Sequence, residues 1–468
     1  MTTTTTRTAR PAPSGRVRGD RGDRVGQPRV VDRAWVVEMV VAINAVVIVG
    51  MWVRHGGISS VGGPGGVAKA AGQITGLLGT YAVLMQLLLM ARLPWLEHHV
   101  GLDRLAVWHR WNGMLSVYLL VAHTVLITVG YASAFHTTLW AQTRDFVNNY
   151  ADVLMAFVGL GLFLAVGVTS ARAARRKLRR ETWYFIHLYA YLAVALGFAH
   201  QLAVGNDFIT DAAARAYWVA LYLVVIGILL TWRVIVPWRF NVRHALKVKN
   251  VVREAPGVVT INLTGRHLGT INAQPGQFFL WRFLTRDGWY KSHPFSISAA
   301  PTAKRLRITV KDLGDTTHEL QSVRPGTRVL AEGPYGTFTA KKHAGRPTLF
   351  IAGGIGITPI RAMLDESRSR SRSTLLYRVN TPEDVVFAKE LDDIATRKGV
   401  DVHLLTGLDI GDDQTDQLGI PAITRLVPDV AERECFVCGP PAMIEAVRRR
   451  LRAIGVPDAA VHFERFEF

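Results

Sequence analysis

The sequence contains little cysteine and few acidic residues. Its two cysteines, Cys435 and Cys438, exclude a disulfide framework, a four-thiolate zinc site and a plant-type iron–sulfur cluster. Their CxxC spacing leaves open a redox-active pair, beside the interpretation that Cys435 is a core residue of a strand. Charged residues make up only 19% of the chain and apolar residues 49%. Much of the chain therefore needs an apolar environment, and its 468 residues suffice for about three domains.

The formal net charge of +19 comes largely from clusters of basic residues beside apolar stretches. Eight arginines lie within residues 1–33, and six arginines or lysines lie within residues 172–180. The preference of cytoplasmic loops for positive charge explains both clusters, and no recognition motif accompanies them, so we expect no nucleic-acid partner. Residues 1–33 lack apolar periodicity and a cleavable apolar core, which predicts a disordered basic tail rather than a signal peptide.

Six apolar stretches are long enough to cross a hydrocarbon core, which takes about 20 residues of helix. An even number of crossings returns the chain to its starting side, and the basic loops favour the cytoplasm for both termini. The sequence thus predicts an integral protein of the cell membrane, in contact with the lipid bilayer. The stretches cover residues 34–53, 71–93, 105–130, 151–170, 182–204 and 216–236.

The pattern changes after Pro237 to short alternating runs separated by glycine and proline, which predict a small antiparallel β-barrel. From Pro347 onward, strands alternate with helices, as in a parallel nucleotide-binding sheet. The predicted fold is therefore multidomain: a six-helix α transmembrane bundle, an antiparallel β-barrel domain and an α/β parallel-sheet domain. The predicted limits are 1–33 for the tail, 34–238 for the bundle, 241–340 for the barrel and 345–468 for the nucleotide-binding domain.

Two of the apolar stretches carry two histidines each, His109 with His123 and His187 with His200. An imidazole within a membrane helix is costly and usually faces a partner or a cofactor. His109 and His123 are fourteen residues apart, which brings them to nearly the same helix face, about 21 Å from each other. Pairing across the helices joins His109 to His187 and His123 to His200, and each pair suits the two axial positions of a haem iron.

The spacing of His187 and His200 fits this scheme less well. Their separation of thirteen residues turns an ideal helix so that the two imidazoles point about 140° apart. A bend, a local change of winding or different approach angles is then required. The alternative is that the four histidines hydrogen-bond to neighbouring helices. His98, His99 and His136 lie at segment ends or in loops, where water is the expected neighbour, with contact to an outer acceptor as an alternative for His136.

The paired histidines lie in the segments RLPWLEHHVGLDRLAVWHRWNG and WYFIHLYAYLAVALGFAH. Through these segments the membrane half resembles the ferric reductase and NADPH oxidase transmembrane family. In that family, six helices hold two b-type haems through four such histidines. The resemblance implies the same metal ligands here, namely His109, His123, His187 and His200.

The run His293-Pro294-Phe295-Ser296 follows a predicted barrel strand, and VKDLGDTTHEL lies downstream. Both resemble the flavin-binding signature of the ferredoxin–NADP reductase superfamily, which implies bound FAD. Proline and phenylalanine shape the backbone beside an isoalloxazine, and the Ser296 hydroxyl suits a flavin or phosphate group. The residues expected to contact FAD are His293, Pro294, Phe295, Ser296, Lys311, Gly314 and Thr317.

The run FIAGGIGITP combines a strand, a glycine turn and a helix start, where free N–H groups and the helix dipole favour a pyrophosphate. It resembles the GGxGxTP turn of the same superfamily, and CGPP resembles that superfamily's second nicotinamide motif. Relatives reach the 2′-phosphate from the position of Arg378, so we expect NADPH ahead of NADH, with an ordinary surface arginine as the alternative. The residues expected on this side are Gly353, Gly354, Gly356, Thr358, Arg378, Gly439 and Pro440.

The resemblance also implies two catalytic residues, Cys438 beside the hydride path and Phe468 stacked on the flavin. A hydride carries two electrons and a haem accepts one, so a flavin must stand between them. We expect electrons to pass from NADPH through FAD and two haems to an outer acceptor, first of all ferric or cupric chelates. Reduction of oxygen to superoxide and a non-catalytic haem-binding membrane module are the alternatives. The oligomeric state is not predicted.

Overall fold

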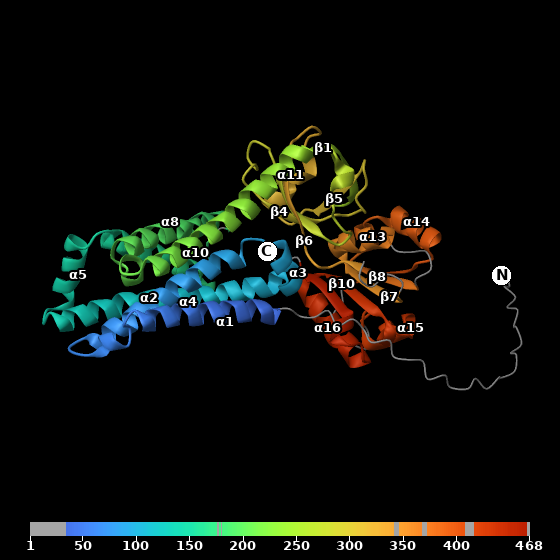
Figure 1. The fold of residues 1–468 in the computed structure, drawn as a ribbon. Coiled ribbons are helices and arrows are strands. Elements are labelled where there is room, and N and C mark those ends of the chain that lie inside the picture. The colour runs from blue at the N-terminus through green and yellow to red at the C-terminus, as the bar shows by residue number, and fades with distance from the viewer. Residues whose placement is uncertain are drawn as a thin grey trace, which may run out of the picture.

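The computed structural model describes residues 34–175, 177–178, 180–340, 346–366, 372–407 and 416–465. The predicted tail over residues 1–33 lies outside this part of the chain. Figure 1 shows an elongated bundle of helices at one end of the molecule and the strand-containing domains at the other end. The apolar front half and the ordinary back half of the sequence are therefore separated in space.

The six predicted membrane crossings are confirmed as helices that are long and apolar enough to span a bilayer. Many of their large apolar side chains are exposed on the protein surface, as lipid-facing side chains are, and Leu223 is 63% exposed. The helices are α1 (Ala34–Arg54), α2 (Gly66–Leu89), α4 (Leu102–Ala134), α6 (Val153–Ser170), α8 (Arg180–Val204) and α10 (Ala212–Leu230).

The sixth crossing continues beyond its predicted end. After α10 the chain forms a π-helical turn over Thr231–Ile235 and then α11 (Val236–His244). Pro237 has no N–H group to donate to the carbonyl four residues earlier, and a wider turn is one way to accommodate this loss. The helix thereby carries the chain from the bundle directly to the first strand.

Two short helices occupy segments for which only loops are predicted. α3 (Pro94–Val100) begins with a proline, which suits the first turn of a helix. α5 (Leu139–Asn149) is capped by Thr138, whose hydroxyl accepts a hydrogen bond from the N–H of Ala141 at 3.2 Å. Figure 1 shows α3 at the end of the bundle next to the strand-containing domains, and α5 at the far end.

Polar side chains join the helices inside the bundle. Gln201 on α8 donates to the Thr80 hydroxyl on α2 at 2.6 Å and accepts from Tyr222 on α10 at 3.0 Å. α1, α2 and α10 share an apolar cluster that includes Ile48, Leu84 and Trp218. Interhelical hydrogen bonds and close packing are what hold helices together in lipid, where burial of apolar surface supplies little.

The prediction of an antiparallel domain is confirmed. Its strands form two three-stranded antiparallel sheets, with the orders β1-β2-β5 and β4-β3-β6. Among the described residues the sheets are joined by single bridges, such as Ile297 with Ile308, rather than by one closed ladder. The strands are β1 (Lys247–Ala255), β2 (Val258–Thr264), β3 (Phe278–Phe283), β4 (His293–Ser296), β5 (Leu306–Lys311) and β6 (Val329–Tyr335).

The prediction of a parallel α/β domain is confirmed as well. Its five-stranded sheet has the order β11-β10-β7-β8-β9, with every pair of neighbours parallel. The chain runs from β7 outward to β8 and β9 and then crosses back to β10 on the other side of β7. The strand order thus reverses between β7 and β10, which opens a crevice at the carboxyl ends of these strands. The elements are β7 (Thr348–Gly353), α13 (Ile357–Glu366), β8 (Ser373–Val379), α14 (Ala388–Lys398), β9 (Asp401–Thr406), α15 (Ile420–Leu426), β10 (Glu434–Gly439), α16 (Pro441–Ile454) and β11 (Val461–Arg465).

Candidate functional site

The inner histidine pair faces across α4 and α8. The ring centres of His109 and His187 lie 6.0 Å apart, with their planes inclined by 54°. A metal bonded to one nitrogen of each ring at about 2 Å would put the ring centres about 6 Å apart. The Trp183 ring lies 5.0 Å from the His187 ring, and the Ser170 hydroxyl lies 3.3 Å from His187 Nδ1. The geometry of this pair therefore fits an iron held axially.

Both histidines of α4 donate from Nδ1 to backbone carbonyls of α2. His109 Nδ1 lies 3.2 Å from the carbonyl oxygen of Gln86, and His123 Nδ1 lies 2.7 Å from that of Gly72. A carbonyl oxygen only accepts, so Nδ1 carries the proton and Nε2 of the neutral ring keeps its lone pair. A metal-bound histidine is usually oriented in this way, by a hydrogen bond from its second ring nitrogen.

A glycine on α2 makes room for the ring of His123. A Cβ atom at Gly76 would lie only 2.4 Å from His123 Nδ1. A side chain at this position is therefore incompatible with the observed place of the imidazole. Gly76 was not predicted, because its role depends on how closely α2 and α4 approach.

His200 differs from the other three histidines. Its Nδ1 is buried and, within the described part of the chain, has no hydrogen-bond partner. His123 is close enough to act on it electrostatically. A buried polar atom without a partner is costly, and a bound group would relieve that cost. α8 is a single α-helix over Arg180–Val204, so no change of helix type separates His200 from His187. A bend or different approach angles must then account for the predicted angle between their imidazoles.

Two polar residues beside the inner pair were not predicted. The amide of Gln86 donates to the carbonyl of His109 at 2.7 Å, and Asn112 donates to Gln86 Oε1 at 2.9 Å. Polar residues within an apolar stretch, at the level of a histidine, are the signal that could have revealed them. Of the remaining predicted positions, His99 bonds the carbonyl of Trp95 and His136 is exposed, whereas the side chain of His98 lies outside the described residues.

The predicted flavin-binding run forms strand β4 itself. Ser296 pairs with Phe278 of β3, and the Trp281 indole donates to the carbonyl of Phe295 at 2.9 Å. The His293 and Phe295 rings are parallel, with centres 5.6 Å apart. The Ser296 hydroxyl is buried and has no hydrogen-bond partner among the described residues. This unsatisfied hydroxyl on an otherwise well-bonded strand fits a residue that holds a cofactor.

The downstream residues of the flavin signature lie in two places. Thr317 stabilises the turn after β5, because its hydroxyl accepts from the N–H of Leu313 at 2.8 Å and donates to the carbonyl of Gly314 at 3.0 Å. Gly314 has φ +142°, in the region that favours glycine. Lys311, at the end of β5, instead lines a cavity between the two strand-containing domains.

This cavity of about 140 Å³ brings together five residues that were predicted separately. Lys311 comes from the antiparallel domain, whereas Gly353, Gly354, Arg378 and Pro440 come from the carboxyl ends of parallel strands. A Cβ atom at Gly354 would meet nothing within 4 Å, so the backbone of the glycine turn is open on this side. The full lining is Val258, Lys311, Gly353, Gly354, Ile355, Arg378, Val379, Asn380, Asp384, Val386, Pro440 and Met443.

Three glycines of the two nucleotide motifs, Gly353 among them, also serve close packing. A Cβ atom at Gly353 would lie 2.6 Å from Met443 Sδ, and one at Gly439 would lie 2.5 Å from Met443 Cε. A Cβ atom at Gly356 would lie 2.3 Å from the carbonyl oxygen of Cys438. The buried Thr358 donates its hydroxyl to the carbonyl of Ile355 at 3.0 Å, within the same turn. The close packing of these residues fixes the backbone that borders the crevice.

Three protein families match successive parts of the chain. Residues 75–198 match the ferric reductase like transmembrane component, residues 244–339 match an FAD-binding domain, and residues 350–449 match the oxidoreductase NAD-binding domain. The chain thus combines a ferric reductase-like transmembrane domain with an FAD-binding domain and an NAD-binding domain. The first match contains His109, His123 and His187 and ends two residues before His200, and the other two matches contain the flavin and nucleotide motifs.

Curated relatives match about half of the chain. They include the glycine betaine monooxygenase reductase subunit of Chromohalobacter salexigens (28% identical over 48% of this chain and 65% of the relative) and an NADPH oxidoreductase of Mycobacterium tuberculosis (28%, 47% and 59%). An NADH oxidoreductase of Escherichia coli is 27% identical over 47% of this chain and 66% of the relative. The chain thus spans less than two thirds of the length of each of these relatives.

Among solved structures, the FAD/NAD-binding domain of a nitric oxide dioxygenase from Vibrio cholerae aligns with a TM-score of 0.41. Its sequence is 23% identical, and the alignment covers 47% of this chain and 98% of that domain. The ferredoxin reductase of a carbazole 1,9a-dioxygenase aligns with a TM-score of 0.40 and 24% identity, over 48% of this chain and 69% of that one.

In the NAD-binding domain, Arg378 is held by a buried carboxylate. Its Nη1 lies 2.9 Å from Asp416, and Arg450 lies 2.6 Å from the other oxygen of the same carboxylate. Two guanidinium groups thus share one carboxylate. Arg378 is buried and structurally engaged, so it is not an ordinary surface arginine.

The two cysteines do not form a redox pair. Cys438 packs in the cluster of Phe350 and Tyr377, whereas Cys435 packs in the cluster of Leu349 and Leu376, on the opposite face of the sheet. Three positions along a strand reverse the side-chain direction, which explains the separation. Both thiols are fully buried, and burial raises the pKa of Cys438 well above its ordinary value, so this thiol stays neutral. Phe468, the other predicted catalytic residue, lies outside the described residues.

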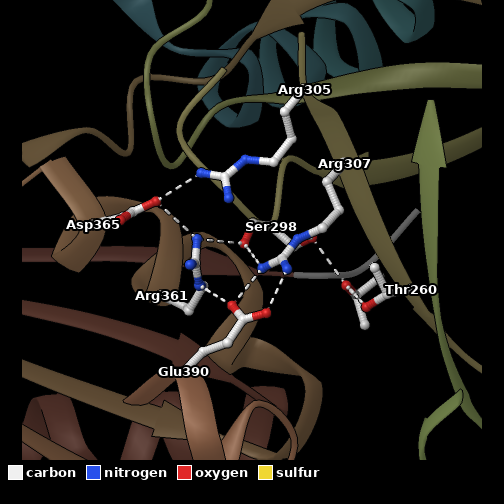
Figure 2. A network of polar contacts seen from close by, with 8 residues as sticks. Thr260, Ser298, Arg305, Arg307, Arg361, Asp365 and Glu390 are labelled. Atoms are coloured by element: carbon white, nitrogen blue, oxygen red, sulfur yellow. Dashed lines mark hydrogen bonds and ion pairs between the residues drawn. The ribbon is translucent and has the colours of Figure 1, made fainter. Parts of the chain in front are cut away.

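A partly buried network of charges joins the FAD-binding domain to the NAD-binding domain, as Figure 2 shows. Arg307 of β5 forms a bidentate ion pair with Glu390 of α14, at 2.7 and 2.9 Å. Arg361 of α13 lies 2.7 Å from the same carboxylate and 3.1 Å from Asp365, which also accepts from Arg305. Ser298 is 2.9 Å from the Thr309 hydroxyl and completes the network. The network thereby holds the FAD-binding domain and the NAD-binding domain at a defined angle to each other.

The membrane bundle contacts the FAD-binding domain through α3 and the chain before it. Arg92 forms an ion pair with Glu332 of β6, and the guanidinium of Arg92 lies 5.4 Å from the centre of the Tyr335 ring. Glu97 of α3 accepts a hydrogen bond from the N–H of Gly336 at 3.0 Å. Burial raises the pKa of Glu97 more than this hydrogen bond and Arg92 lower it. The end of α4 that carries His109 therefore lies on the side of the FAD-binding domain.

Proposed function

We propose that this chain is a membrane oxidoreductase that moves electrons from cytoplasmic NADPH through FAD and two b-type haems to an acceptor across the membrane. The proposed acceptors are ferric or cupric chelates. The proposed units are a di-haem membrane domain (34–238), an FAD-binding domain (241–340) and an NAD(P)-binding domain (345–468), with both termini on the cytoplasmic side. The observation that carries the proposal is the His109–His187 pair, with ring centres 6.0 Å apart at the end of the bundle that contacts the FAD-binding domain.

The metal-binding role is assigned to four histidines on two helices. His109 and His187 would hold the haem nearer the flavin, and His123 and His200 would hold the haem nearer the far side. The hydrogen bonds from His109 and His123 to α2 support this assignment, because they leave Nε2 unprotonated. The buried, unpartnered Nδ1 of His200 supports the presence of a bound group beside it.

The soluble part of the chain supplies binding and orientation. FAD, when bound, accepts a hydride from the nicotinamide and passes single electrons to haem. The Ser296 hydroxyl offers a hydrogen bond to FAD, and the open backbone at Gly354 offers N–H groups to the nucleotide. Lys311 and Arg378 place positive charge at the same cavity. Arg378 is the reason to propose NADPH ahead of NADH, since a guanidinium matches a phosphate in shape and charge.

The proposal is tested with purified protein in inside-out vesicles. NADPH is added outside, a ferric chelate is enclosed, and chelate reduction is followed together with the absorbance of b-type haem. We expect the haem to be reduced by NADPH and the chelate to be reduced with superoxide dismutase present. Complete loss of chelate reduction with the dismutase would indicate oxygen as the acceptor, and haem that stays oxidised would indicate a binding module without electron transfer.

A further inference from the structure

A cavity of about 440 Å³ lies against α11, just beyond the sixth membrane crossing. It contains none of the residues assigned to haem, FAD or nucleotide. Its lining comes from α11 and one residue of the FAD-binding domain: Trp238, Arg239, Phe240, Val242, Arg243, His244 and Thr270.

The position of this cavity relative to the membrane follows from the length of the helix. The helix from Ala212 to His244 has 33 residues. The hydrocarbon core accommodates about 20 of them, which from Ala212 ends at the π-helical turn over Thr231–Ile235. Trp238 and Arg239 therefore lie at the level of the lipid headgroups, on the side of the FAD- and NAD-binding domains. Tryptophan and arginine are the residues that proteins place at this depth.

The exposed face of α11 continues the lipid-facing face of α10. Val234, Trp238 and Val242 follow one another at intervals of four and are 55%, 64% and 54% exposed. The opposite face is bound to the FAD-binding domain, where Asn241 forms two hydrogen bonds with the backbone of Ala331, at 2.8 and 2.9 Å. The cavity is thus next to the membrane surface, and the helix that lines it also holds the FAD-binding domain.

The charge at this surface is positive and uncompensated. Arg239 and Arg243, four residues apart, are both exposed, and neither has a carboxylate partner within the described part of the chain. Arg266 adds a third guanidinium, which donates to the carbonyl of Val242 at 3.2 Å. By contrast, Arg233 on the same helix lies 3.9 Å from Glu332. Guanidinium groups bind phosphate through paired, charge-assisted hydrogen bonds.

We propose that this cavity binds the phosphate headgroup of an anionic phospholipid from the adjacent leaflet. Arg239 and Arg243 pair with the phosphate, Trp238 lies beside the glycerol, and the acyl chains follow the apolar face that includes Val234. Because Asn241 on the same helix holds Ala331, the bound lipid fastens the FAD-binding domain to the membrane surface. This inference does not depend on the proposed electron path.

The test measures binding of short-chain phosphatidylglycerol to the full-length protein in detergent, by native mass spectrometry. Replacing both arginines in R239Q/R243Q should weaken the tightest binding about thirtyfold, the effect of two basic residues near an anionic surface. R239K/R243K keeps the charge but loses the paired guanidinium hydrogen bonds, so its affinity should lie between those of R239Q/R243Q and the unchanged protein. The matched control is K389Q/R397Q, which removes two exposed basic residues from α14, at the end of the molecule remote from the bundle (Figure 1).

Two results would overturn the proposal. The first is equal binding of phosphatidylglycerol to R239Q/R243Q and to the K389Q/R397Q control. The second is full competition by inorganic phosphate at the same concentration, which would identify a site for a free anion instead of a lipid. Short-chain phosphatidylcholine, which carries a phosphate but no net charge, should bind weakly to all of these proteins.

Discussion

The glycine at position 76 determines where the ring of His123 lies. A methyl group in G76A would come within 2.4 Å of His123 Nδ1 and would force the ring away from the carbonyl of Gly72, which it now bonds at 2.7 Å. If His123 binds the outer haem, we expect the haem content of G76A to fall by about half, since loss of an orienting hydrogen bond weakens metal ligation. A pyridine haemochrome spectrum, expressed per protein chain, measures this.

The control for this substitution is G227A, on α10. A Cβ atom at Gly227 would meet nothing within 4 Å, so the same change of residue is made without a clash. G227A should keep its haem. A haem content in G76A that matches G227A would show that His123 does not hold a haem in the observed orientation.

At the residue scale, the sequence allowed the chemically distinctive positions to be predicted, but not their surroundings. The four histidines stand out because an imidazole is rare in an apolar helix. Gly76 does not stand out, because its role depends on the contact between α2 and α4, and no local pattern encodes that contact. The cysteines show the converse case, since a CxxC spacing suggests a pair, whereas strand geometry puts Cys435 and Cys438 on opposite faces.

At the scale of elements, β5, α13 and α14 meet where the buried guanidinium groups of Arg307 and Arg361 share the partly buried carboxylate of Glu390 (Figure 2). Removing the carboxylate in E390Q leaves two buried guanidinium groups without their shared partner, which is strongly destabilising for the contact. We expect the rate of flavin reduction by NADPH to fall about tenfold or more, because hydride transfer depends on the angle between the two domains. Stopped-flow absorbance of the flavin measures this rate.

The matched control for E390Q is D458N. Asp458 also receives a bidentate pair from an arginine, Arg452, at 2.8 and 2.9 Å, but this pair is exposed and lies within one domain. D458N should reduce its flavin at the unchanged rate. Equal rates in E390Q and D458N would mean that the network does not set the domain angle needed for hydride transfer.

The same carboxylate predicts a dependence of stability on pH. Burial raises the pKa of Glu390, but Arg307 and Arg361 together lower it by more, so the pKa lies below the ordinary value of 4.5. A carboxyl with a lowered pKa in the folded state stabilises the protein above its unfolded pKa and loses this contribution as the pH falls. The thermal midpoint should therefore fall more steeply below about pH 4.5 in the unchanged protein than in E390Q. Parallel curves would contradict the prediction.

Hydropathy and periodicity predicted most elements, and the exceptions have local causes. The six crossings are long apolar stretches, and the strands of the FAD-binding domain are short alternating runs. The central strands of the NAD-binding domain are short runs buried on both faces, separated by helices. α3 and α5 are too short and polar to be distinguished from loops by periodicity. β11 (Val461–Arg465) was missed because it is a short run of mixed apolar and charged residues. This run becomes a strand at the edge of the sheet by pairing with β10. The π-helical turn after α10 depends on Pro237 and on the continuation of the helix.

At the scale of the whole molecule, the electron path requires the FAD-binding domain to be held against the bundle. Arg92 and Glu332 join these parts, and Glu97 adds a hydrogen bond to Gly336. The substitution R92Q removes the positive partner of a half-buried carboxylate between them. We expect flavin reduction by NADPH to be unchanged and the subsequent reduction of haem to slow by on the order of tenfold, because the two steps lie on different sides of this contact.

The two steps are separated by following flavin and haem absorbance after rapid mixing with NADPH. The control is E319Q, which breaks the Lys291–Glu319 ion pair of 2.7 Å within the FAD-binding domain and should change neither step. If R92Q slowed flavin and haem reduction equally, the contact would act on the FAD-binding domain alone. Unchanged haem reduction would mean that the bundle and the domain are held together by other contacts, such as the hydrogen bonds between Asn241 and Ala331.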